Sequence, residues 1–232
     1  MPGLPVTRVS PRTLAVLGAT LLVGAGIGAL ADRAWLSHDA QVRYLRQSLD
    51  PRLRPNYQMR LSQLARLPSG PSLVMLGDSL TQWGEWPEWL GPGAANRGIG
   101  GDTSRGLRQR LQLSVPASAK TVVIMIGLND LKDVKWRPET TVGNVSAILD
   151  ELKGRRVILQ SVLYTDDPVK NRKVDQINAG YARLCALGRC EWLDLNGVVA
   201  PKGRLTERES LDGGHLKGVA YEAWAKALKA RL

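Results

Sequence analysis

From Pro71 onward, apolar runs alternate with stretches that have helical spacing. Most of the apolar runs are rich in Val, Ile, Leu and Met and predict strands at Leu73–Leu76, near Ala94–Asn96, and at Thr121–Ile126, Arg156–Leu163 and Glu191–Leu195. The stretches between and after them predict helices at Leu80–Leu90, Ser104–Leu113, Thr140–Leu152, Val174–Ala186 and Gly218–Leu232. Nearly continuous apolar strands are typical of a sheet covered on both faces. The pattern therefore predicts an α/β fold with a parallel sheet.

The amino-terminal part has a different pattern. Leu14–Ala31 is apolar or small throughout, apart from Thr20, and its length is close to the ~20 residues that span a bilayer as a helix. Ala29-Leu30-Ala31 also fits the cleavage pattern of a secretory signal, but the run is longer than a usual signal core of roughly 7–15 residues. A buried core helix is disfavoured because the run has no polar face. We expect residues 1–31 to be a membrane anchor, with a cleaved signal peptide as the alternative.

Either interpretation sends the rest of the chain across a membrane. Arg8 and Arg12 precede the apolar segment and favour an amino terminus on the inner side, although arginines also follow it. The expected location of the domain is therefore the periplasmic or other extracytoplasmic side. There it is either membrane-anchored or secreted after signal cleavage.

A polar, Arg-rich region connects this segment to the domain. Residues 32–70 predict two helices, over Trp35–Leu49 and Tyr57–Leu67. The apolar face of the second helix consists of Met59, Leu61, Leu64 and Leu67. We interpret this region as a helical stalk whose last helix packs on the domain. The turn at Pro68–Pro71 then begins the domain itself, residues 71–232.

Charge and composition restrict the classes of function. The net charge is +11, but Lys and Arg are scattered and no nucleic-acid-binding signature is present, so we expect a solvated basic surface and no nucleic-acid partner. The chain has two cysteines, Cys185 and Cys190, and two histidines, His38 and His215. These provide almost no material for a His/Cys metal site. The cysteines can form a disulfide in an exported domain or remain two buried thiols.

Polar and Gly-rich segments follow predicted strands or precede the last helix. They are Gly77-Asp78-Ser79, Asn96–Thr103, Gly127–Asp130 and Asp212–His215. In an open α/β sheet, ligands bind outside the carboxyl ends of the strands. These segments are therefore expected to meet at one edge of the sheet.

Together the segments supply what acyl transfer requires. Ser79 can attack a carbonyl carbon, His215 can take its proton, and Asp212, three residues earlier, can orient the imidazole. The N–H groups of Ser79 and Gly101 and the side-chain amide of Asn129 can stabilise an oxyanion.

Each segment also has a purely structural interpretation. Asp78 or Ser79 can cap a helix, Asn129-Asp130 can do the same, and residues 98–101 can be a flexible turn. His215 is the only histidine after residue 38, so histidine chemistry in the domain depends on it. The combination of all four segments favours catalysis over separate structural roles.

These residues resemble the GDSL or SGNH hydrolase family. Its catalytic Ser, Gly, Asn and His match Ser79, Gly101, Asn129 and His215, and its Asp matches Asp212. The stretch Gly-Ile-Gly-Gly-Asp-Thr resembles the branch of platelet-activating-factor acetylhydrolase-like subunits and bacterial relatives. The resemblance implies a flavodoxin-like three-layer α/β/α sandwich with a five-stranded parallel sheet. It also implies ester hydrolysis through an acyl-enzyme, without a metal or organic cofactor.

The expected function is a serine esterase that acts on small, acetyl-like esters of lipids or cell-envelope glycans. The alternatives are an O-acyltransferase that uses the same acyl-enzyme and a non-catalytic tethered binding module. The presence of Ser79, Asp212 and His215 together argues against the last, because binding alone does not need all three. Trp83, four residues after Ser79, is expected either in the core or beside the acyl pocket.

Overall fold

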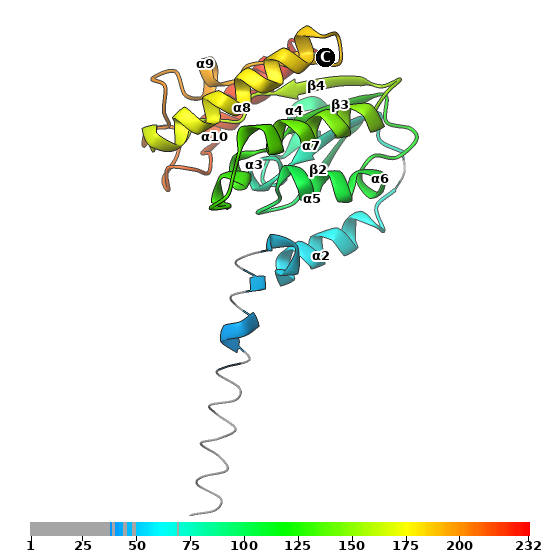
Figure 1. The fold of residues 1–232 in the computed structure, drawn as a ribbon. Coiled ribbons are helices and arrows are strands. Elements are labelled where there is room, and N and C mark those ends of the chain that lie inside the picture. The colour runs from blue at the N-terminus through cyan, green and yellow to red at the C-terminus, as the bar shows by residue number, and fades with distance from the viewer. Residues whose placement is uncertain (1–37, 39, 44–45, 48–49, 69) are drawn as a thin grey trace, which may run out of the picture. The chain divides into compact units, whose positions relative to one another are not determined.

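A parallel sheet lies at the centre of the protein in the computed structural model, which describes residues 38, 40–43, 46–47, 50–68 and 70–232 (Figure 1). Its five strands are β1 (Leu73–Gly77), β2 (Ala94–Gly98), β3 (Thr121–Met125), β4 (Arg156–Gln160) and β5 (Glu191–Leu193). They lie in the order β2-β1-β3-β4-β5, and every neighbouring pair is parallel. The predicted five-stranded parallel sheet is confirmed. Because the order reverses between β1 and β3, the carboxyl ends of these two strands form a topological switch point, where ligands bind in such sheets.

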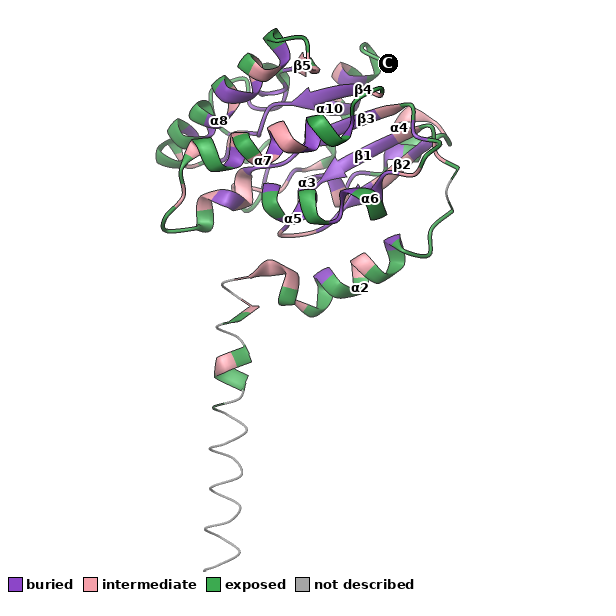
Figure 2. Cartoon of the chain, turned by 45° about the vertical axis from the view of Figure 1, so that its right-hand side comes forward, coloured by how far each residue is buried: buried purple, intermediate pink, exposed green. Residues whose placement is uncertain are grey.

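Helices cover both faces of the sheet and make three layers (Figure 1). One face carries α5 (Ser104–Gln109), α6 (Leu111–Ser114), α7 (Pro138–Glu151) and α8 (Pro168–Ala186). The other carries α3 (Ser79–Gln82), α4 (Trp86–Leu90), α9 (Asn196–Val199) and α10 (Gly218–Lys229). Figure 2 shows that buried residues fill the strands. In β3, Val122 and Ile124 pack toward the first face and Val123 and Met125 toward the second, which explains the continuous apolar run.

The predicted membrane anchor at Leu14–Ala31 lies outside the described residues. Within the part of the chain that is described, no helix is long and apolar enough to cross a membrane. Residues 38, 40–43 and 46–47, which belong to the helix predicted over Trp35–Leu49, are helical.

The compact unit that contains the sheet begins at Asp50 rather than at Pro71. It includes the 3-10 helix η1 (Pro51–Leu53) and α2 (Pro55–Leu64). Both elements therefore belong to the same unit as the sheet, in keeping with the expectation that the last helix of the region packs on the domain.

Helix α2 packs against the loop that follows β2. Tyr57 and Leu64 form a buried cluster with Ile99. Met59 and Leu67, which we expected on the apolar face, are exposed. The apolar spacing located the helix and part of its buried face, since Leu64 is buried and Leu61 packs against the cluster, whereas the ring of Tyr57 fills the rest of the contact.

The helix predicted at Leu80–Leu90 is divided into α3 and α4, so the prediction of one helix is wrong. The Trp86 ring folds back over Gly84, where an added Cβ would come within 2.4 Å of the ring. Its Nε1 also donates a hydrogen bond to the carbonyl of Thr81 at 2.7 Å. Pro87 then lies in the first turn of α4, where a proline is tolerated.

Cys185 and Cys190 form a disulfide that joins the last turn of α8 to the segment before β5. The chain reverses between them at Gly188, whose φ is +75°. The bond therefore lies near the amino end of β5, at the edge of the sheet opposite the carboxyl ends of the strands.

Candidate active site

Ser79 is the first residue of α3, directly beyond the carboxyl end of β1. Asp78 caps this helix, because its Oδ1 accepts a hydrogen bond from the N–H of Leu80 at 3.0 Å. The turn requires a glycine at position 77, since a Cβ there would lie 2.0 Å from the Thr81 hydroxyl oxygen. The capping interpretation is thus confirmed for Asp78. The same turn presents the neighbouring serine at the edge of the sheet.

The structure brings Ser79, His215 and Asp212 into one chain of contacts. The hydroxyl oxygen of Ser79 lies 3.1 Å from Nε2 of His215. On the other side of the ring, Nδ1 lies 2.6 Å from Oδ2 of Asp212. An imidazole held between a hydroxyl and a carboxylate is the arrangement in which histidine can act as a base toward serine.

A tight turn holds the Asp212 carboxylate in place. Its Oδ1 accepts hydrogen bonds from the N–H groups of His215 at 2.7 Å and Gly214 at 3.0 Å. The N–H of His215, its imidazole and the N–H of Gly214 hold the pKa of Asp212 well below its usual range. The carboxylate is therefore ionised at neutral pH and can stabilise a positive charge on the ring.

Gly213 fixes this turn to the loop that follows β4. Its φ of +76° lies in the left-handed region, and a Cβ there would come within 2.2 Å of the Asp166 carboxylate. Its carbonyl accepts the N–H of Asp166 at 2.9 Å. The turn that carries His215 is thus attached to the body of the domain.

The three expected oxyanion donors lie around the same pocket. Ser79, Gly101, Asn129 and His215 all line a pocket of about 480 Å³. Gly101 has a φ of +79°, a conformation that favours glycine. The structure therefore brings every site residue expected from the sequence to one place.

Contacts on both sides orient the Asn129 side chain. Its Nδ2 donates to the carbonyl of Asp102 at 3.0 Å and lies 3.3 Å from Oδ2 of Asp78. Its Oδ1 accepts a hydrogen bond from Nζ of Lys132 at 2.7 Å. The ammonium group fixes which end of the amide is the donor, and that donor end faces Asp78 beside the serine.

Asp78, which directly precedes Ser79, is fully buried. Burial raises the pKa of Asp78 to about 7, and the hydrogen bond from Leu80 opposes part of this rise.

A buried ion pair supports the loop after β2. Nε of Arg110 lies 2.7 Å from Oδ2 of Asp102, and both side chains are almost fully buried. The Arg110 guanidinium also donates to the carbonyls of Arg97 at 2.8 Å and Gly77 at 3.0 Å. Arg110 thereby joins the carboxyl ends of β1 and β2. It also lies between α5 and α6, where one helix was expected. An arginine between the apolar Leu107 and Leu111 was the available signal in the sequence.

Asp130 has a structural role that the sequence suggested only in part. Its carboxylate accepts the N–H and the hydroxyl of Ser104, the first residue of α5, and the hydroxyl of Thr141 at 3.0 Å. It therefore caps a helix, as one interpretation predicted, but the helix is α5, whose first residue precedes Asp130 by 26 residues. Burial raises the pKa of Asp130.

The tryptophans after Ser79 have separate roles. Trp83 lines the pocket and stacks on His215, with ring centroids 4.3 Å apart. Trp86 is buried in the core, where it packs edge-on against Trp224. Of the two roles considered for Trp83, the structure favours the pocket.

Across the described residues, no three His, Cys, Asp or Glu side chains gather as metal ligands. Ser79, His215 and Asp212 instead have the arrangement of a catalytic triad at the carboxyl edge of a parallel sheet. This fold and this site define the class of the serine hydrolases.

Comparisons with known proteins agree with that class. The model of the GDSL-like Lipase/Acylhydrolase family matches residues 75–223. Platelet-activating factor acetylhydrolase IB subunit alpha2 of Rattus norvegicus is 29% identical over 175 residues, which cover 68% of this chain and 74% of the relative. The chain belongs to the GDSL-like Lipase/Acylhydrolase family, whose members are carboxylic ester hydrolases.

Solved structures show the same fold. A GDSL-like lipase from Bacteroides thetaiotaomicron matches with a TM-score of 0.63 and 24% identity, over 76% of this chain and 96% of that chain. A catalytic mutant of an acetylxylan esterase from Geobacillus stearothermophilus matches with a TM-score of 0.60 and 20% identity, over 70% of this chain and 94% of that chain.

Proposed function

We propose that this protein is a serine esterase in which Ser79 is the nucleophile, His215 the general base and Asp212 the residue that orients the base. The observation that carries this proposal is the chain of contacts from the Ser79 hydroxyl through the imidazole to the carboxylate, at 3.1 and 2.6 Å. The proposed oxyanion donors are the N–H groups of Ser79 and Gly101 and the amide of Asn129.

In the first half of the reaction, Ser79 Oγ attacks the ester carbonyl carbon while Nε2 of His215 takes the hydroxyl proton. The carbonyl oxygen becomes an oxyanion, which the three donors stabilise. As the intermediate collapses, the bond to the alcohol breaks and His215 gives the proton to the leaving oxygen. The acyl group remains on Ser79 as an ester.

In the second half, water replaces the alcohol. His215 takes a proton from the attacking water. As the second tetrahedral intermediate collapses, the bond to Ser79 Oγ breaks, His215 returns the proton to Oγ, and the carboxylic acid is released. Throughout, Asp212 stays ionised and stabilises the imidazolium, in keeping with its low pKa.

The proposed substrates are small, acetyl-like esters of lipids or cell-envelope glycans. Two of the similar proteins support a short acyl group, since one is named an acetylhydrolase and the other an acetylxylan esterase. The pocket, about 480 Å³, includes Trp83 and Leu128 as apolar walls.

We also propose that the enzyme acts outside the cytoplasm, anchored through residues 1–31 or secreted after their cleavage. The length of the apolar run at Leu14–Ala31 supports this location. The Cys185–Cys190 disulfide is a second support, because such bonds persist in oxidising compartments.

The test is hydrolysis of a series of p-nitrophenyl esters, from acetate to decanoate, by the full-length chain in a non-ionic detergent. We expect turnover of the short esters and its loss in Ser79→Ala. Adding an acetyl-accepting oligosaccharide and measuring acetylated product separates transfer to a sugar from transfer to water. Equal rates for the parent and Ser79→Ala, with both folded, would contradict the proposal.

A further inference from the structure

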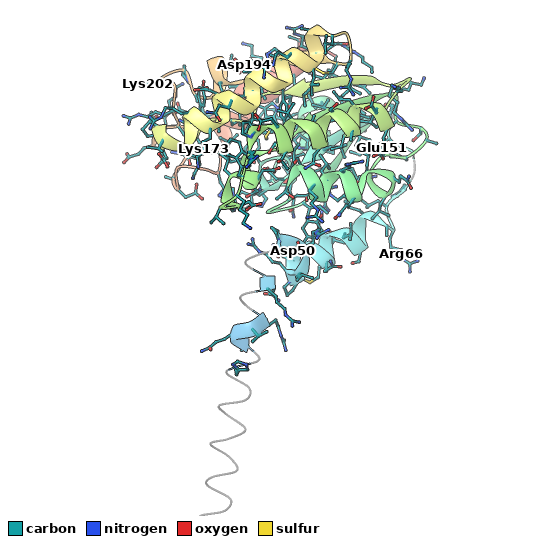
Figure 3. All side chains as sticks on the ribbon, viewed as in Figure 1. Asp50, Arg66, Glu151, Lys173, Asp194 and Lys202 are labelled. Carbon is teal, nitrogen blue, oxygen red and sulfur yellow. A yellow bond between two sulfur atoms is a disulfide. The ribbon has the colours of Figure 1, made fainter. Side chains whose placement is uncertain are left out.

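Three cationic side chains line the pocket, and they come from separate parts of the chain. Arg54 immediately precedes α2, Lys132 ends the 3-10 helix η2 (Leu128–Lys132), and Lys170 lies in the first turn of α8. Figure 3 shows Lys173, one turn further along α8, at the end of the molecule opposite Glu151. The cations thus gather at the carboxyl edge of the sheet, around the nucleophile.

The acidic residues of the pocket do not balance these charges. Asp78 is fully buried and accepts the N–H of Leu80, while Asp212 is bound to His215. Both carboxylates therefore already have partners in the site. Three cationic side chains and two carboxylates line the pocket, so its lining carries more positive than negative groups.

Two of the cations lie directly beside the expected oxyanion donors. A Cβ placed on Gly101 would lie 3.3 Å from Nη1 of Arg54. Lys132 donates to the side-chain oxygen of Asn129 at 2.7 Å. A group bound between these cations would therefore lie close to the scissile ester.

Lys170 is exposed and lines the pocket. Its ammonium group makes no hydrogen bond or ion pair within the described part of the chain and is therefore available to an anion in the pocket. Burial and then the positive charge of Arg54 lower the pKa of Lys132; the negative charge of Asp78 opposes this, and the charge of Lys170 lowers the pKa further. Like charges held together around a pocket repel one another until an anion binds between them.

We propose that Arg54, Lys132 and Lys170 form a subsite for an anionic group, a phosphate or a carboxylate, carried by the substrate near its acyl ester. This inference rests on the proposed esterase function and defines its substrate class. The substrate is then an acylated acidic molecule, and Trp83 and Leu131 provide apolar walls for the rest of it.

The matched test compares 4-acetoxybenzoate with 4-acetoxybenzamide, which differ in charge but present the same acetyl ester. We expect the full-length enzyme to have a higher kcat/KM for the carboxylate, by about 10-fold at low ionic strength, and this ratio to fall as salt is added. Lys170→Gln is expected to reduce the ratio by about 3- to 10-fold. Because the ratio is compared within one variant, a general loss of activity does not affect it.

Arg172→Gln is the control. Arg172 is exposed, lies two residues further along α8 and does not line the pocket. Its removal changes the net charge of the protein as much as Lys170→Gln does. An equal fall of the ratio in both variants would mean that overall charge, and not a subsite, attracts the anion.

Binding to the Ser79→Ala protein, measured by calorimetry, separates the subsite from the chemistry. We expect 4-acetoxybenzoate to bind more tightly than the amide, and Lys170→Gln in this background to remove the difference. 4-Acetoxyphenyl phosphate shows whether the subsite prefers phosphate to carboxylate. If both esters are hydrolysed but neither assay shows a preference for 4-acetoxybenzoate over the amide, the subsite is overturned and the esterase function stands. Anion-selective binding without hydrolysis supports the subsite and overturns the esterase.

Discussion

The indole of Trp83 stacks on the imidazole of His215, with ring centroids 4.3 Å apart and an angle of 28° between the planes. Trp83 follows the last residue of α3, so the helix that starts at the proposed nucleophile also supports one face of the proposed base. One short element therefore carries the first catalytic candidate, and the residue that ends it contacts the second.

Removing this support should slow the reaction. We expect Trp83→Ala to lower kcat by about 10-fold, because the imidazole loses a rigid neighbour and samples unproductive rotamers. Trp83→Phe should keep most of the activity, since it retains a flat ring. Stopped-flow assays with p-nitrophenyl acetate give kcat directly. The partly exposed Trp89→Ala is the matched control, and an equal loss there would refute a specific role for the stack.

Asn129 is expected to act on the transition state more than on substrate binding. Asn129→Ala should reduce kcat by about 10²–10³-fold with a small change in KM, the usual cost of losing one oxyanion donor. The variant also leaves the carbonyl of Asp102 without its partner at 3.0 Å. Thermal unfolding must therefore accompany the kinetics. A folded variant with unchanged kcat would remove Asn129 from the oxyanion site.

Asp78 makes a pH-dependent contribution to stability. Its pKa is raised by burial from 3.8 to about 7. Between these values the folded protein holds a proton that the unfolded chain has released, so stability from this group falls as pH rises from about 4 to 7. Asp78→Asn removes the buried charge and still accepts the N–H of Leu80. Its Tm relative to the parent should rise by roughly 10 °C between pH 4 and pH 8.

Calorimetric scans at several pH values measure this difference. The exposed Asp194→Asn is the control for the substitution itself. If the Tm difference between Asp78→Asn and the parent is the same at both ends of the pH range, Asp78 does not titrate there.

The disulfide should affect stability and not catalysis. Replacing both Cys185 and Cys190 by Ser removes a crosslink that closes a short loop, which we expect to cost about 2 kcal/mol of unfolding free energy. The loop lies at the edge of the sheet away from Ser79, so kcat should stay at the parent value. Urea denaturation of the double variant, with the reduced parent beside it, tests both statements. A large fall in kcat would show that the two edges are coupled.

The sheet was predictable because strands buried on both faces have continuous apolar sequences, as in Thr121–Met125. The site residues were predictable as a group because each follows a strand or precedes the last helix; their catalytic roles stay predictions. Pocket cations such as Lys170 were not predictable from the sequence. They lie on elements far apart in the chain, and only the fold shows that they converge.

The positions at which helices are interrupted were also not predictable from the sequence. Nothing in the spacing distinguishes Trp83 from Trp86, yet the first faces the pocket and the second enters the core. The difference arises because α3 ends before Gly84 and the Trp86 ring packs back over that glycine. Similarly, Arg110 lies where the helical pattern divides into α5 and α6, and its contact with Asp102, eight residues earlier, is one that helical periodicity does not predict.

The contact between Ser79 and His215 joins residues 136 positions apart. A cut in the exposed loop between α9 and α10 would leave the nucleophile and all three proposed oxyanion donors on one fragment, and the base with its carboxylate on the other. Neither fragment alone holds a complete triad, and the fragments regain it only when α10 docks on the sheet. Colour released from a chromogenic ester would then serve as an optical reporter of fragment reassembly.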